Sequence, residues 1–179
     1  MSEIPSQRDL TIFTIGHSNH SIEAFLELLQ SHQIEVLVDI RSQPYSRYSS
    51  QFNAPELKQA IKRTDLKYLY MGKELGGRPE NREFYDQAGH VLYNKVAQST
   101  LFLSGIARLE QGIENFRVAI MCSEEDPLNC HRRLLVGRVL KERGINLAHI
   151  RGDGALQSEA DLVKPQPDIQ LSLFLENDL

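Results

Sequence analysis

One short segment of the chain contains both cysteines, with a histidine beside the second. Cys122 ends an apolar run, and seven residues separate it from Cys130, which is followed by His131 and Arg132. A thiolate is a nucleophile, and nearby cations or a helix N-terminus lower its pKa. With Asn129 as the N-cap of a following helix, the helix dipole favours a thiolate at Cys130. The segment therefore indicates thiol chemistry, in which each cysteine is either the nucleophile or structural support.

Three other interpretations of the cysteines are open. A cysteine in an α/β core is usually a small buried hydrophobe, and Cys122 fits that description. Cys122, Cys130, His131 and His17 together offer four zinc ligands. Seven residues between the cysteines is not a standard zinc spacing, however, and a regulatory disulfide is disfavoured in a reducing compartment. We therefore expect no metal and no other cofactor.

Polar clusters also follow three earlier apolar runs, at residues 16–19, 39–42 and 73–78. Ligands of open α/β sheets bind beyond the carboxyl ends of the strands, where the loops meet helix N-termini. Four clusters that converge on one edge predict a binding site there. The residues expected to contact a substrate are Gly16, His17, Ser18, Arg41, Gly76, Gly77, Arg78 and Arg132.

The catalytic side chains expected at this edge are Asp39, Glu124, Cys122, Cys130 and His131. Asp39 and Glu124 are the acid/base candidates, because partial desolvation raises the pKa of a carboxyl group. Arg41 and Arg132 can bind anionic groups through their paired donors. Asp39 and Arg41 also lie on the same side of an extended strand, so an ion pair between them is the simpler alternative.

The elements that must position these residues alternate between strand and helix. Apolar, β-rich runs predict strands at residues 11–15, 35–40, 66–70, 117–121 and 145–150. Helices are expected after Ser21, from Pro55, between the third and fourth strands, and over residues 130–143. Because parallel neighbours need a crossover, this order predicts an α/β fold with a mostly parallel sheet, covered by helices on both faces as a Rossmann-like three-layer sandwich.

Composition sets the limits on the class of protein. The chain has 179 residues, 41% of them hydrophobic and 25% charged, which suits one globular domain. We expect this domain over residues 1–155 and a tail over residues 156–179. A net charge of −4 argues against a protein that binds nucleic acid through its overall positive charge. With no long apolar run, no signal-peptide core and two cysteines, we expect a cytoplasmic protein without a membrane partner.

The polar clusters together resemble the family called domain of unknown function 488. The resemblance runs in order from about residue 11 to residue 150. It is carried by Thr14-Ile15-Gly16-His17-Ser18, Val38-Asp39-Ile40-Arg41 with Pro44 and Ser46, Leu75-Gly76-Gly77, and Cys122-Ser123-Glu124 followed by Cys130-His131-Arg132. It implies an α/β fold and a polar site built from these segments, and it supplies no reaction.

The tail contains a second short resemblance. Gln170-Leu171-Ser172-Leu173-Phe174 is similar to the peptide by which bacterial DNA polymerases and repair proteins bind the β sliding clamp. An extended segment of this kind places Leu173 and Phe174 in an apolar pocket and anchors Gln170 by hydrogen bonds. The alternative is a terminal strand or turn packed on the sheet, which the alternating apolar residues from Ile169 to Leu175 favour.

These features give one leading function and two alternatives. The leading prediction is a bacterial DNA-maintenance or nucleotide-processing enzyme, a hydrolase or group transferase, that the sliding clamp recruits to DNA. Local basic residues with interleaved aromatics, such as Arg47 beside Tyr45 and Tyr48, suit contact with a nucleic-acid strand. The alternatives are a small-molecule hydrolase or transferase unrelated to DNA, and a ligand-sensing module without catalysis; in both, the tail is structural.

Overall fold

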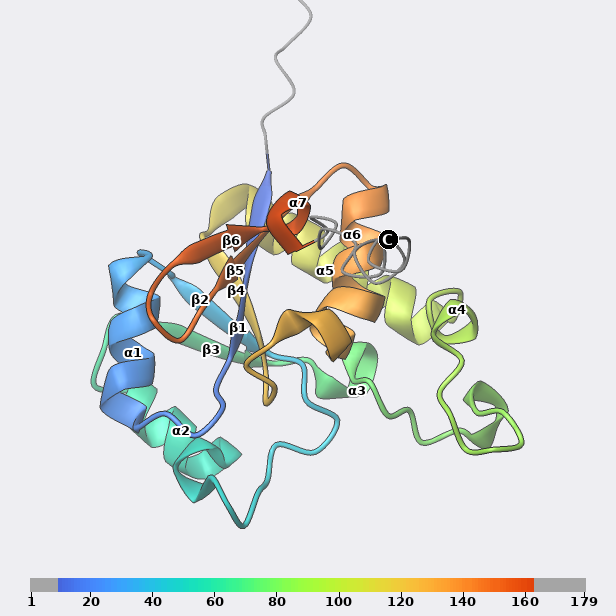
Figure 1. Cartoon of the computed structure of the whole chain (residues 1–179), viewed down its shortest axis with the longest axis horizontal. Helices are drawn as coiled ribbons and strands as arrows, with labels where there is room; N and C mark the ends of the chain where they lie inside the picture. Colours follow the sequence, from blue (N-terminus) through green and yellow to red (C-terminus); the bar gives the residue numbers. More distant parts are fainter. Residues whose placement is uncertain (1–9, 163–179) are drawn as a thin grey trace, which may run out of the picture.

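A six-stranded sheet in the order β3-β2-β4-β1-β5-β6 forms the centre of the molecule (Figure 1). The computed structural model describes residues 10–162. The first five strands pair in parallel, and β6 runs antiparallel to β5. The strands are β1 (Thr11–Gly16), β2 (Val36–Asp39), β3 (Lys67–Tyr70), β4 (Val118–Cys122), β5 (Asn146–Ile150) and β6 (Leu156–Ser158).

Helices cover both faces of the sheet (Figure 1). One face packs against α1 (Ile22–Ser31) and α2 (Ala54–Ile61), and the other against α5 (Thr100–Asn115) and α6 (Arg138–Glu142). Shorter helices are α3 (Gly72–Leu75), α4 (Tyr93–Val96) and α7 (Glu159–Leu162). The predicted three-layer α/β sandwich is therefore confirmed. Within residues 10–162, no helix is both long enough and apolar enough to cross a membrane.

Alternation along the strands divides the core into two apolar layers. Ile12 of β1 faces α5 and α6, whereas Phe13 faces α1 and α2, since successive strand side chains point to opposite faces. The predicted cap of the first helix is present, because the Ser21 hydroxyl accepts a hydrogen bond from the amide of Ala24. A second serine, Ser99, caps α5 in the same way. The serine caps therefore fix where α1 and α5 begin, and their buried apolar residues fix which side of each helix packs on the sheet.

The helix expected over residues 130–143 begins later than predicted. Asp126, and not Asn129, accepts the capping hydrogen bond, and it starts a short 3-10 helix over Pro127–Asn129. Cys130 then has an extended backbone, with φ −102° and ψ 140°, so it lies outside the helix that follows. That helix opens with a π-helical stretch over Arg132–Gly137 and continues as α6.

Register brings the site segments to one edge of the sheet. Gly16 of β1 pairs with Cys122 of β4, and Asp39 of β2 pairs with Met121 of β4. A side chain at Gly16 would overlap the backbone carbonyl of Glu124, so glycine lets the loop after β4 lie directly on the end of β1. The sheet itself continues past residue 155, where we expected the tail to begin, because β6 and α7 follow there. The clamp-like peptide lies outside the described residues.

Candidate functional site

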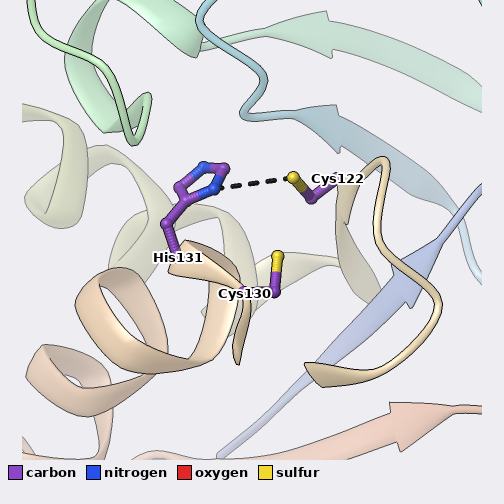
Figure 2. Close-up of side chains that lie close together, drawn as sticks. All are labelled: Cys122, Cys130 and His131. Atoms are coloured by element: carbon purple, nitrogen blue, oxygen red, sulfur yellow. Dashed lines mark hydrogen bonds between the residues drawn. The ribbon is translucent and has the colours of Figure 1, made fainter. Parts of the chain in front are cut away.

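A cysteine and a histidine meet at the carboxyl edge of the sheet (Figure 2). The sulfur of Cys122, the last residue of β4, lies 3.5 Å from Nδ1 of His131. The Nε2 atom of that ring lies 3.0 Å from the carbonyl oxygen of Ile40. A carbonyl only accepts hydrogen bonds, so Nε2 carries a proton, and in the neutral ring Nδ1 is left as an acceptor facing the sulfur. The imidazole is therefore oriented to exchange a proton with Cys122.

Cys122 is the more acidic of the two thiols. A hydrogen bond from the Cys130 thiol is the main cause that lowers the pKa of Cys122 to about 7, and the amides of Ser123 and Glu124 and the charge of Arg132 act in the same direction. The same contact, together with burial, raises the pKa of Cys130 to about 12. The helix-dipole argument for a thiolate at Cys130 therefore does not apply, because this residue precedes the helix and its thiol donates a hydrogen bond to Cys122.

A buried arginine holds the loop after β4. Arg132 has no exposed surface, and its guanidinium donates to the backbone carbonyls of Glu124 and Glu125. Its Nε atom donates to the hydroxyl of Thr14, which also bonds His149 at 2.8 Å. All these partners of the guanidinium are neutral groups. Arg132 therefore shapes the loop that surrounds the thiolate, and it does not project into open space as a substrate ligand.

The charge of Arg132 also acts on Cys122. A buried guanidinium without a counter-charge is costly, and Arg132 is one of the groups that lower the pKa of Cys122. The nearby cations Arg133 and Arg151 are already paired, with Glu159 and Glu125 respectively. Arg132, whose own hydrogen-bond partners are neutral, therefore favours the ionised form of Cys122.

Asp39 and Arg41 form the ion pair that the strand geometry allows. Asp39 is fully buried and accepts from two guanidinium nitrogens of Arg41, at 2.9 and 2.7 Å, and from the hydroxyl of Tyr68. The Nε2 atom of His17 lies 3.2 Å from a third guanidinium nitrogen of Arg41 and accepts a hydrogen bond from it. Burial is the main cause that lowers the pKa of His17 to about 4. These contacts occupy both oxygens of Asp39, so the structure gives no support for its expected acid/base role.

A cavity of about 460 Å³ opens in front of the thiols. Its walls include three of the expected substrate-contacting residues, Arg41, Gly77 and Arg78, and the catalytic candidates Glu124, Cys122, Cys130 and His131. Tyr45, one of the aromatics expected to contact nucleic acid, also lines it, together with Glu80 and Tyr93, which no spacing in the sequence marks. A second cavity, of about 570 Å³, lies near the start of β2 and β3, at the opposite edge of the sheet.

The remaining expected residues are not among those that line the cavity. Gly76 packs against Ser42, and Ser18 donates its amide to the Ser123 carbonyl, so both support loops. Gly77 lies against the ring of His131, and a side chain there would come within 2.6 Å of the imidazole Cγ atom. Gly77 therefore leaves the space that the His131 imidazole occupies.

We expect Gly77→Ala to displace His131 from Cys122. The added methyl overlaps the ring, so the fold is expected to lose about 1–3 kcal/mol of stability, and Cys122 is expected to react more slowly with iodoacetamide. Gly112→Ala is the matched control, because that helical site has only the Val118 side chain, at 3.8 Å, near an added methyl. Normal Cys122 reactivity in Gly77→Ala would contradict this role of the glycine.

The same three side chains can also hold a metal ion. One ligand atom each from Cys122, Cys130 and His131 lies within 4.8 Å of the others. Two thiolates and an imidazole suit a soft ion such as Zn²⁺, with a fourth position open to the cavity. However, seven residues between the two cysteines is not a standard zinc spacing, which favours the form without a metal.

Fold and site together define an α/β protein with a cysteine–histidine pair at the carboxyl edge of a parallel sheet. The family described as "Domain of unknown function DUF488" matches residues 21–139. The chain belongs to this family, as the polar clusters predicted. Neither the curated proteins nor the solved structures contain a match to the chain.

Proposed function

We propose that this protein is a hydrolase or group transferase in which Cys122 is the nucleophile. The observation that carries the proposal is the placement of the Cys122 sulfur, 3.5 Å from a nitrogen of His131 and on the wall of a cavity. A nucleophile within reach of a base that a third group orients is the arrangement of covalent catalysis. Here the orienting group is the carbonyl of Ile40, which fixes the imidazole through Nε2.

The proposed reaction proceeds in two steps. His131 holds the proton of Cys122 at Nδ1 while the thiolate attacks an electrophilic carbon of the substrate. The imidazolium then gives this proton to the leaving group, and a covalent thiol adduct remains. In the second step water or another acceptor gives a proton to His131 and attacks the adduct, which releases the product and regenerates the thiolate. Glu124, whose exposed side chain faces the same cavity, is the candidate for binding this acceptor.

A nucleotide unit is the proposed substrate class, either free or in a nucleic-acid strand. Two tyrosines near the cavity support this proposal, since Tyr45 is 65% exposed and lines the wall, and Tyr48 is 99% exposed on the same loop. Arg47 lies between them in sequence, and such aromatic and basic side chains stack on bases and contact phosphates. A small polar metabolite is the alternative substrate, for which the cavity volume alone suffices.

Turnover screening tests the proposal. The wild-type protein and Cys122→Ser would be compared on nucleosides, nucleotides, damaged single-stranded DNA, and small polar esters and amides. We expect one of these classes to be turned over by the wild type, with a covalent adduct at Cys122 visible by mass spectrometry. Turnover that survives in Cys122→Ser would disprove a nucleophilic role. Tight binding without turnover would instead support a ligand-sensing module.

Recruitment by the bacterial sliding clamp is a separate part of the proposal, and it rests on the sequence of residues 170–174. We expect the intact protein to bind purified clamp with micromolar affinity by calorimetry, because Leu173 and Phe174 bury apolar surface in the clamp pocket. The double variant Leu173→Ala, Phe174→Ala is expected to lose this binding. Absence of binding by the folded wild-type protein would rule out the clamp as a partner, and the strongest argument for a role at DNA would be lost.

A further inference from the structure

Cys130 has a thiol that the proposed two-step reaction does not use. Its sulfur lies beside that of Cys122, with the reactive atoms of Cys122, Cys130 and His131 all within 4.8 Å of one another (Figure 2). Both cysteines line the same cavity. A thiol is a weak hydrogen-bond donor, so a serine hydroxyl would stabilise the Cys122 thiolate at least as well. The presence of sulfur at position 130 therefore points to sulfur chemistry.

The arrangement of the three side chains suits thiol oxidation. The Cys122 sulfur lies 3.5 Å from Nδ1 of His131, which can accept a proton, and the Cys130 sulfur belongs to the same cluster. A thiolate next to a second, resolving cysteine is the arrangement of peroxide-sensitive sites. The backbone of Cys130 is extended and lies outside the following helix, so its sulfur can approach Cys122 without unwinding that helix.

We propose that Cys122 and Cys130 form a reversible disulfide when the protein meets a hydroperoxide. This inference rests on the proposed function, because it requires Cys122 to be the nucleophilic thiolate. The disulfide consumes both thiols of the site and closes it to substrate. The pair is therefore proposed as a modification site through which a hydroperoxide inactivates the enzyme and a small thiol restores it.

The proposed oxidation takes place in two steps. The Cys122 thiolate attacks one oxygen of the hydroperoxide, the O–O bond breaks, and the leaving oxygen takes a proton to give water or an alcohol. Cys122 is oxidised to a sulfenic acid, and the peroxide is reduced. The Cys130 sulfur then attacks the Cys122 sulfur, an S–S bond forms, the S–O bond breaks, and hydroxide leaves with the thiol proton as water.

The cavity makes the disulfide accessible to a reductant. Both cysteines line its wall, and thiol–disulfide exchange requires that an attacking thiol reach one of the two sulfurs. A small thiol such as dithiothreitol is therefore expected to restore both free cysteines.

Hydrogen peroxide added to the fully reduced full-length chain tests the inference. The wild type is expected to lose both free thiols, gain an intramolecular disulfide by mass spectrometry, and recover both thiols after dithiothreitol. In Cys130→Ser, Cys122 is expected to stop at a sulfenic acid that dimedone traps, and in Cys122→Ser, the Cys130 thiol is expected to persist. Cys130→Ala provides a second variant if the serine form is not folded by circular dichroism.

Iodoacetamide labelling of the same reduced samples separates the two proposals. If Cys122 is alkylated but peroxide leaves Cys130 free in the wild type, the disulfide is overturned and the nucleophilic role of Cys122 stands. If Cys122 reacts with neither reagent in the folded protein, both proposals fail. Disulfide formation together with alkylation of reduced Cys122 supports both.

Discussion

Cys122→Ser is expected to lower kcat/KM by at least about 10³-fold for any substrate that the wild type turns over. A serine hydroxyl at this position has an alkoxide pKa far above that of the thiol, so the stabilisation from Cys130, the loop amides and Arg132 no longer produces an anion near neutral pH. The measurement is steady-state turnover of the substrate class found by screening, with the fold checked by circular dichroism.

Ser123→Ala is the matched control for this loss. Ser123 is the next residue, its side chain is exposed, and its amide, which supports the thiolate, is kept in the variant. We expect its kcat/KM to stay within a few-fold of the wild type. If both variants lost activity equally, the effect would belong to the loop and not to the sulfur of Cys122.

Arg132→Ala is expected to lower the free energy of unfolding by about 3–5 kcal/mol, because it removes a fully buried charge-bearing side chain and leaves a cavity and unpaired carbonyls. This loss is a large fraction of the 5–15 kcal/mol or so that stabilises a typical domain. Urea unfolding followed by circular dichroism measures it. Arg132→Lys keeps the charge but not the three directed donors, so an intermediate loss is expected.

Arg108→Ala is the control for removing an arginine. Arg108 pairs with Glu74 at 2.7 Å but is 49% exposed, and exposed pairs contribute at most about 1 kcal/mol. If Arg132→Ala were as stable as this control and still inactive, Arg132 would act on the substrate, as the sequence alone predicts. The structure predicts instead that Arg132→Ala is less stable than Arg108→Ala.

Periodicity and topology were sufficient to predict the framework of the site. Alternating strands and helices predict a parallel sheet, and parallel strands bring the loops after β1, β2 and β4 to one edge whatever the details of packing. The pairing of Asp39 with Arg41 also follows from strand geometry, since side chains two residues apart share a face. These predictions depend on local pattern and connectivity, which a single sequence contains.

Which cysteine ionises depends on three-dimensional contacts that a sequence does not contain. The helix-dipole argument places the thiolate at Cys130, but this residue follows the 3-10 helix that Asp126 caps and lies outside the next helix, and its contact with Cys122 raises its pKa. Burial of Arg132 is equally hidden, because its partners are backbone carbonyls and the Thr14 hydroxyl, far away in sequence. An arginine after a cysteine and a histidine otherwise suggests an exposed anion ligand.

Support for this site also comes from residues without a sequence signal. His149 is fully buried and links Thr14, at 2.8 Å, to Glu159, at 3.1 Å. Glu159 also pairs with Arg133. Because Thr14 accepts a hydrogen bond from Arg132, the start of α7 is connected through His149 and Thr14 to the arginine that holds the loop after β4. A lone histidine in a strand has no pattern that identifies such a chain of contacts, which only the packed fold creates.

The pH profile of Cys122 alkylation by iodoacetamide, followed site by site with mass spectrometry, tests directly whether Cys122 is the thiolate of this site. Only the thiolate reacts, and the pKa of Cys122 is lowered to about 7, so its rate should rise with pH through about 7 and then level off. Cys130, whose pKa is raised, should stay unreactive over this range. Cys130→Ala should move the Cys122 midpoint to higher pH, since the first cause of the lowered pKa is removed. A Cys122 midpoint at the ordinary thiol value, unchanged in Cys130→Ala, would contradict the thiolate that we place at the centre of this site.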